Sequence, residues 1–438
     1  MSSTFTCIGV VPIASRIVKD LSGDPDHVDK QSSVLLVTIW ELGEAAGPLF
    51  IGPLSELLGR RRVLNVATVL FILFTVMAAC SNSVKLFIAA RCLTGIAVAS
   101  NVLNPAIVGD VFPEEQRGAA LSYVMLAPLI GGAAGPAIAG AIADSLGWRQ
   151  VLWMAAALAL ACELVFLCCF RETYSVVILR RRAAEQMRIT GNENIRTVYD
   201  VDSDTNEAGF WFSIVRPFRV LASSGVLQIL SLFGGMDYTY FYILSTTLPD
   251  ILYDIYGLSS ALAGTCFVAF SAGSAISVVI CNLSLDRIYI SLREKNKGID
   301  RAEYRLPLVI VGAVALPLTV IAYGWTAQAH LSLSILLFVS GLLGVFMFLC
   351  YLPVTAYVVD ALGQYSASGM TALIVVRCLM GTFLPLVCNP LADEYGYGWG
   401  FSVLGGISIL MAVIPILLYR YGAIWRLRCE FTSSEQNR

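Results

Sequence analysis

The chain has 438 residues, of which 57% are hydrophobic and only 14% charged, whereas about a quarter of the residues in a soluble domain are charged. Its mean hydropathy is +0.74 and its formal net charge at pH 7 is −2. These values exclude a soluble globular protein and give no reason to expect nucleic acid as a partner. Apolar runs of roughly 20 residues follow one another with short polar gaps, so the chain is predicted to be an all-α integral membrane protein.

Cysteine and histidine usage gives no indication of a metal site or a disulfide framework. The twelve cysteines are scattered, most of them inside apolar runs, and the chain has only two histidines. No G-x-x-x-x-G-K-[ST] motif is present, which argues against an ATP-driven pump. We therefore expect no cofactor, no metal and no enzymatic reaction.

The first half of the chain begins with an apolar stretch, residues 5–14, that has about half the length of a membrane span. We interpret it as the outer half of a first helix whose beginning is missing. Five further helices are predicted near residues 33–58, 63–80, 86–111, 118–143 and 148–170.

A polar segment, residues 171–219, separates these helices from a second set. The second set is predicted near residues 225–249, 259–284, 306–325, 332–358, 369–391 and 399–421. The predicted organisation is an N-terminal six-helix bundle over 1–170, a cytoplasmic linker over 171–219, a C-terminal six-helix bundle over 220–424 and a cytoplasmic tail over 425–438.

The positions of the basic residues orient this topology. Of the 29 Lys and Arg residues, 22 lie in the gaps that it places inside the cell, five lie near the outer face and two lie within helices. Because basic residues accumulate on the cytoplasmic side, both termini are predicted to be cytoplasmic.

Internal repetition supports two related halves. The tripeptide VGD at 108–110 has a counterpart in VVD at 358–360, and Gly147-Trp148 has one in Gly398-Trp399. Gly52 and Glu56 similarly match Asn282 and Asp286, again four residues apart. Three correspondences in the same order indicate a duplicated six-helix unit.

The stretch GPLSELLGRRR at 52–62 resembles the signature between helices 2 and 3 of the major facilitator superfamily, with Glu56 in the usual Asp position and Leu57 where an Arg is usual. Together with RCLTG, GGAAGPAIAG, the YRLP before helix 9 and GYGWG before helix 12, it makes the chain similar to fungal drug:proton antiporters of the twelve-helix class. The resemblance covers nearly all of the chain from helix 2 onward. It implies the major facilitator fold, with two pseudo-symmetric six-helix bundles.

The same stretch predicts a cytoplasmic gate. Glu56 is expected to approach the positive N-terminus of helix 11 near Gly369, and Arg60 is expected to pair with Asp110. Such contacts would clamp the two halves together in one state only. The alternative is a run of arginines that only sets the topology. The gate residues are Gly52, Glu56, Gly59, Arg60, Arg61, Asp110 and Gly369.

Helix 5 contains small residues around a proline: Gly131, Gly135, Pro136 and Gly140. Small residues allow close helix contacts and proline bends a helix. The run resembles the antiporter signature of the superfamily, although Ser122 and Ala139 replace two of its glycines. The resemblance favours efflux over uptake, and ordinary helix packing remains an alternative.

Proton coupling is assigned to Glu44 first, then to Glu41 and Arg91. A carboxylate at membrane depth can alternate between a proton and a cationic partner. Arg91, in RCLTG, matches by resemblance the helix 4 motif that is assigned to proton coupling. The alternatives are that Glu41 lies near the outer water interface and that Arg91 is a paired strut between helices.

The substrate cavity is expected to include an acidic and aromatic segment of helix 7, with Asp237, Tyr238 and Tyr240, followed by Phe241 and Tyr242. Aromatic rings with hydroxyl groups suit varied lipophilic molecules, although they also serve as packing residues. The further candidates for the cavity are Asn101, Glu163 and Arg377.

The sequence thus predicts a monomeric, multi-pass transporter that expels small lipophilic molecules in exchange for protons by alternating access. The plasma membrane is favoured over the vacuole by the resemblance. The alternatives are a facilitator or symporter for sugar or other nutrients and a transport-inactive truncated isoform.

Overall fold

The computed structural model describes residues 2–22, 30–98, 100–112, 114–191, 197, 210–299, 301–362 and 365–426. Within these ranges all regular secondary structure is helical. Nine described helices are long and apolar enough to cross a membrane, and residues 214–223 with the helix that follows them, bent by 102° against each other, would make a tenth span. The prediction of an all-α membrane protein is confirmed.

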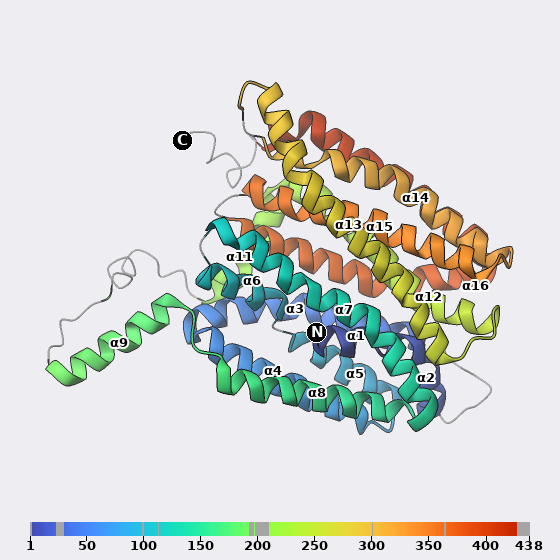
Figure 1. Cartoon of the computed structure of the whole chain (residues 1–438), viewed down its shortest axis with the longest axis horizontal. Helices are drawn as coiled ribbons and strands as arrows, with labels where there is room; N and C mark the ends of the chain where they lie inside the picture. Colours follow the sequence, from blue (N-terminus) through green and yellow to red (C-terminus); the bar gives the residue numbers. More distant parts are fainter. Residues whose placement is uncertain are drawn as a thin grey trace.

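The first half of the chain forms one group of packed helices (Figure 1). In this group α4 packs against α5 and α8, α3 packs against α5, and α1 packs against α7. The elements are α1 (Ser2–Ile8), η1 (Val11–Ile13), α2 (Ala14–Ser22), α3 (Lys30–Leu58), α4 (Arg60–Ala79), α5 (Val84–Ile96), α6 (Ser100–Val111), α7 (Glu114–Leu146) and α8 (Trp148–Cys169).

The second half forms another group, in which α14 and α12 pack against α16 and α13 packs against α15. Its elements are α11 (Phe210–Ser223), α12 (Gly225–Asp254), α13 (Ser260–Lys295), η3 (Ala302–Arg305), α14 (Pro307–Gln328), α15 (Leu333–Leu362) and α16 (Ser366–Arg426). Between the two groups α9 (Ser175–Thr190) projects away from the helices (Figure 1).

Two pairs of helices make the most extensive described contacts between the halves. α3 packs against α16, and α7 packs against α13. Each pair joins a helix of the first half to one of the second. The contacts of side chains between these helices therefore change when the halves move relative to each other.

Glycine marks the sharp turns between consecutive spans. Gly59, between α3 and α4, and Gly147, between α7 and α8, both have φ of +95°, a conformation that side chains with a Cβ rarely adopt. Gly396, with φ of +82°, breaks α16 into the two spans Ser366–Ala392 and Glu394–Arg426.

The structure differs from the predicted helices at four places. The first predicted helix consists of three short pieces, with Pro12 in η1, and the fourth is divided into α5 and α6. α13 continues to Lys295, beyond the predicted limit of residue 284, and the polar linker contains the helix α9. Basic residues are compatible with a helix that continues into water, which hydropathy alone does not indicate.

Candidate functional site

A buried ion pair links the two halves. Arg377 Nη2, in the first span of α16, lies 3.4 Å from Glu44 Oε1 in α3, and both residues are only 6% exposed. The other carboxylate oxygen of Glu44 accepts a hydrogen bond of 3.2 Å from the indole Nε1 of Trp40. An acid of one half therefore neutralises a cation of the other, inside the protein.

Aromatic groups of the second half surround the guanidinium of Arg377. Its Nη1 donates to the hydroxyl of Tyr351 at 2.9 Å, and its carbon atom Cζ lies 4.1 Å from the centre of the Tyr238 ring. Tyr238 in turn contacts the rings of Phe241 and Tyr242 at centroid distances of 6.0 and 5.7 Å. These rings form an apolar wall beside the ion pair.

A second polar bond between the halves lies one helical turn away. The hydroxyl of Tyr242, in α12, donates to Glu41 Oε1 at 2.5 Å. Glu41 is 1% exposed, and its other oxygen, Oε2, has no hydrogen-bond partner among the described residues. Glu41 is therefore buried in this structure and does not lie at the outer water interface.

One group of described residues could offer three ligands to a metal ion: Glu41, Glu44 and Cys378, whose ligand atoms all lie within 4.8 Å of one another. Arg377 already lies among them, because its Nη2 contacts Glu44 and also Cys378 Sγ, at 3.9 Å. Since a permanently charged guanidinium contacts this group, it would repel a metal cation there.

Arg91 bonds to the backbone of the broken first helix. It is buried in α5 and donates to the carbonyl oxygens of Thr6 at 2.9 Å and Cys7 at 3.0 Å, and its Cζ lies 4.7 Å from the centre of the Trp40 ring. Helix α1 ends at Ile8, so these carbonyls lack the partners that a continuing helix would supply. This geometry matches the strut alternative, in which Arg91 caps the broken first helix.

The predicted cavity residues point in different directions. Tyr238 faces the ion pair, whereas the Tyr240 hydroxyl bonds to Ser408 and, at 3.0 Å, to the carbonyl of Leu404, both in the second span of α16. Glu163 is buried in α8 beside Thr68 of α4, within the first half. The side chain of Asn101 lies outside the described residues.

The predicted contact of Arg60 with Asp110 is present. Arg60 Nε lies 3.2 Å from Asp110 Oδ2, and the guanidinium also donates to the hydroxyl of Ser55. Glu172, after α8, accepts hydrogen bonds from the backbone N–H groups of Arg60 at 2.8 Å and Arg61 at 3.3 Å. Glu172 thus caps the N-terminus of α4, a role the sequence reasoning missed although an acid after a helix was visible.

The second predicted gate contact, between Glu56 and the helix that begins near Gly369, is not seen among the described residues. Glu56 is exposed, and no described residue forms an ion pair or hydrogen bond with its side chain. Gly369 packs against Leu362 of α15, and Gly52 is partly buried in α3. Arg61 instead donates to the carbonyl of Leu167 at 3.0 Å. The predicted contact of Glu56 with the start of α16 is therefore absent from the described contacts.

The second half has a counterpart to the Arg60 site. Arg305, in η3, lies 2.9 Å from Asp360 and 2.5 Å from Asp286. Asp360 and Asp286 are the residues that the internal repeat pairs with Asp110 and Glu56. The repeat therefore extends to an arginine that contacts the aspartate at the end of the fourth helix of each half.

Three residues of the helix 5 motif lie at close helix contacts. A Cβ added to Gly140 would collide with the carbonyl of Ser260, and one added to Gly264 of α13 would collide with the carbonyl of Pro136. Gly135 packs against Phe5 of α1, and Gly131 is buried. The motif therefore seats α7 against α13 of the opposite half, with no room for a methyl group between them.

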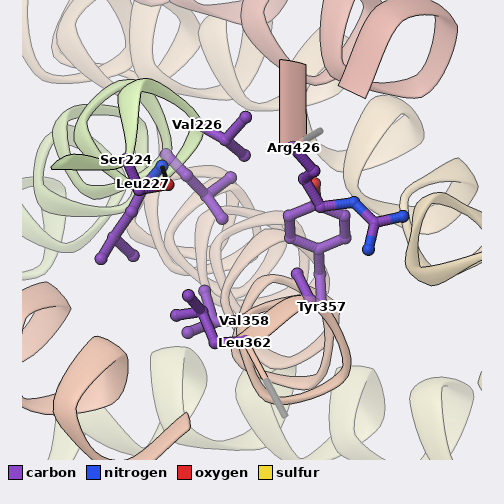
Figure 2. Close-up of a pocket in the computed structure, with 9 residues that line it drawn as sticks. Ser224, Val226, Leu227, Tyr357, Val358, Leu362 and Arg426 are labelled. Carbon is purple, nitrogen blue, oxygen red and sulfur yellow. Dashed lines mark hydrogen bonds between the residues drawn. The ribbon is translucent and has the colours of Figure 1, made fainter. Parts of the chain in front are cut away.

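A small cavity lies apart from the ion pair, at the end of the second half where α12 begins and α15 ends (Figure 2). It is lined mainly by apolar side chains, with Tyr357 and Arg426 at one side, and it has room for about one water molecule. The buried hydroxyl of Tyr357 has no hydrogen-bond partner among the described residues. This cavity is too small for an organic cargo.

Comparison with known proteins places this geometry in a family. The family model described as "Major Facilitator Superfamily" matches residues 1–385. The chain is 33% identical over 428 residues to efflux pump radE of Floropilus chiversii, which covers 96% of this chain and 79% of the relative. It is also 33% identical over 421 residues to MFS-type transporter penM of Penicillium rubens, covering 96% of this chain and 82% of the relative.

Solved structures show the same fold. The human organic anion transporter MFSD10 superposes with a TM-score of 0.65 at 19% identity, over 94% of this chain and 97% of that one. The inward-open xylose transporter XylE from E. coli superposes with a TM-score of 0.66 at 17% identity, over 95% and 94%. The protein is therefore a membrane transporter that belongs to the major facilitator superfamily.

Proposed function

We propose that this transporter expels small lipophilic molecules in exchange for protons, by alternating access between its two halves. The observation that carries the proposal is the buried ion pair of Glu44 with Arg377. It joins α3 of one half to α16 of the other, and one of its members can gain a proton while the other cannot.

Protonation changes the strength of this link. When Glu44 gains a proton it loses its charge, and Arg377 keeps only neutral acceptors. A buried cation without a counter-charge is costly, so the contact between the halves weakens and the alternative arrangement becomes more favourable. The link from Tyr242 to Glu41 responds in the same way, because a hydrogen bond to a carboxylate is stronger than one to a neutral acid.

Two observations favour efflux over uptake. Relatives at 33% and 32% identity are named efflux pumps, including probable efflux pump mfs2 of Aspergillus flavus. The helix 5 motif, which resembles the antiporter signature, packs α7 directly against α13 across the boundary between the halves. Proton entry would then supply the free energy for expelling the cargo.

The aromatic wall beside Arg377 supports a lipophilic cargo. Tyr238, Phe241 and Tyr351 present flat ring surfaces with two hydroxyl groups next to the ion pair. Such surfaces bind varied aromatic and apolar molecules with few directional constraints. We assign substrate contact to this wall and not to Tyr240, which bonds within its own half.

We further propose that the Arg60 end is cytoplasmic, where Arg60 and Asp110 form part of a gate that changes between states. The proposed division of the chain is a bundle over 1–170, a linker over 171–219, a bundle over 220–424 and a tail over 425–438, both termini being cytoplasmic. The protein is proposed to act as a monomer in the plasma membrane.

The test is proton flux in vesicles that contain the purified full chain, measured with and without a panel of lipophilic molecules. The parent protein is expected to take up protons against the outward flux of at least one lipophile, and Glu44→Gln is expected to abolish that coupling. Glu185→Gln, on the exposed face of α9, is the matched control and should behave as the parent. Protons that move in the same direction as the cargo, or an unchanged Glu44→Gln variant, would contradict the proposal.

A further inference from the structure

Asp237 is a buried acid outside the ion-pair cluster. It lies near the middle of α12, is 2% exposed, and neither of its carboxylate oxygens has a hydrogen-bond partner among the described residues. No described Arg, Lys or His forms an ion pair or hydrogen bond with it. It differs in this from Glu41, Glu44 and Glu303, each of which forms at least one polar bond.

Its neighbours place Asp237 inside the second half. Tyr240, one turn further along α12, bonds to the second span of α16. Cys350, in α15, and Tyr240 both interact electrostatically with the Asp237 carboxyl. Tyr238, the next residue after Asp237, faces Arg377 from a different side of α12. Asp237, which the sequence analysis places in the substrate cavity, thus has a different environment from the aromatic wall beside Arg377.

The charge state of Asp237 follows from this environment. An ionised carboxylate at membrane depth needs a cation, a set of hydrogen-bond donors or water, and the described surroundings supply the weakly polar thiol of Cys350 and the Tyr240 hydroxyl, which already bonds to α16. Asp237 therefore carries a proton in this conformation.

Helix α12 connects Asp237 to the link between the halves. Tyr238 and Tyr242, one turn apart on α12, contact Arg377 and Glu41, and Asp237 lies about 100° around the helix from Tyr238. Of these two contacts only the bond from Tyr242 to Glu41 reaches the opposite half, because Arg377 lies in the same half as α12, and α12 loses this bond when the halves separate. A shift of α12 is then the movement that exposes the acid to water or to a donor.

We propose that Asp237 is a second proton-binding residue, loaded in the conformation described here and emptied when the link between Glu44 and Arg377 breaks. This inference rests on the proposed proton coupling, which it deepens by adding one proton to each transport cycle. The acid acts on the energetics of transport without contact with the cargo.

Infrared spectroscopy of the purified full chain in vesicles tests the proposal directly. The parent is expected to show the carbonyl band of a protonated carboxylic acid at neutral pH, and Asp237→Asn should lack it while remaining folded. Asp237→Glu keeps the acid and should keep a band. In Arg377→Gln, where the link is broken, the Asp237 band should weaken. A band that is absent from the parent, or one that is unchanged in Arg377→Gln, would overturn the proposal.

The proton-to-cargo ratio gives the second measurement, with any lipophile that moves protons through the parent. Asp237→Asn is expected to lower this ratio by one proton while transport continues, whereas Glu44→Gln abolishes coupling. An unchanged ratio in Asp237→Asn would refute the role of Asp237 and leave the proposed function standing. If no lipophile moves protons through the parent, the proposed function fails, and the infrared bands still decide the state of Asp237.

Discussion

Arg91 in the first half and Arg377 in the second are both buried among the described residues, and they differ in the chemistry of their acceptors. Arg91 donates to the backbone carbonyls of Thr6 and Cys7, which cannot gain a proton in the physiological range. Arg377 pairs with the carboxylate of Glu44, an acidic side chain of the opposite half. The comparison teaches that a buried arginine can be held by fixed backbone acceptors or by an acid, and the proposed proton coupling requires the second arrangement.

Trp40 stands between the two sites. The face of its indole ring lies below Arg91, and its N–H donates to Glu44. Arg91 therefore helps, through Trp40, to position Glu44, the acid that pairs with Arg377. Substitutions at these residues can separate a role in folding from a role in coupling.

The largest effect on stability is expected for Arg91→Met. It removes the two bonds that Arg91 donates to the carbonyls of Thr6 and Cys7, each worth about 1–3 kcal/mol, and should lower the free energy of unfolding by about 2–6 kcal/mol. Thermal denaturation of the purified protein measures this loss. Arg62→Met, at an exposed arginine, is the control. Equal melting temperatures for the two variants would contradict the capping role.

The next prediction concerns the ion pair of Glu44 and Arg377. Arg377→Gln is expected to weaken the coupling between proton gradient and cargo flux by about 5- to 150-fold, which corresponds to a coupling free energy of about 1–3 kcal/mol. The double variant Glu44→Gln, Arg377→Gln should lose less stability than the sum of the losses of the two single variants. The difference should be about 0.5–3 kcal/mol, because no unpaired charge remains in the double variant. Additive losses of stability would show that the two residues do not interact.

A smaller effect is expected for Tyr242→Phe, which removes the donor to Glu41 and should shift the balance between the two states by about 1–2 kcal/mol. The distance between non-cysteine spin labels at Leu57 and Val359, exposed residues of opposite halves, reports this balance. Tyr240→Phe is the matched control, because its hydroxyl bonds within one half. If both variants change the distance distribution equally, the bond from Tyr242 to Glu41 is not a specific link.

The smallest effect is predicted for Asp20, which forms a partly exposed ion pair with Arg149. Arg149 pairs with Asp20 at 2.9 Å, and the hydrogen bond from the Trp148 indole, followed by that from Arg149, holds the pKa of the Asp20 carboxyl below its ordinary value. Because the folded-state pKa is lowered, Asp20 stabilises the protein above its unfolded-state pKa, and this contribution disappears as the pH falls through the folded-state pKa. Asp20→Asn should therefore lower the free energy of unfolding at neutral pH by no more than about 1 kcal/mol, which is measured as a small drop in melting temperature. A larger deficit in acid than at neutral pH would contradict this sign.

The halves and their local motifs could be predicted because they depend on short-range patterns. Apolar runs gave most helices within a few residues, and the repeat pointed to Asp110 and Asp360, which pair with Arg60 and Arg305. Breaks within helices were harder to predict. The interruption between α1 and α2 depends on Arg91, a residue about 85 positions away, which supplies the donors that make the break acceptable.

The sequence by itself determined that the chain spans a membrane, where its charges fall and that Glu41 and Glu44 lie inside a helix, because composition and periodicity are local properties. Only the tertiary structure decided which charges meet. Glu44 and Arg377 are 333 residues apart, and Asp237 and Tyr238 are adjacent yet face different surroundings. Which face of a helix meets which neighbour depends on the packing of all the helices together, and no single segment encodes it.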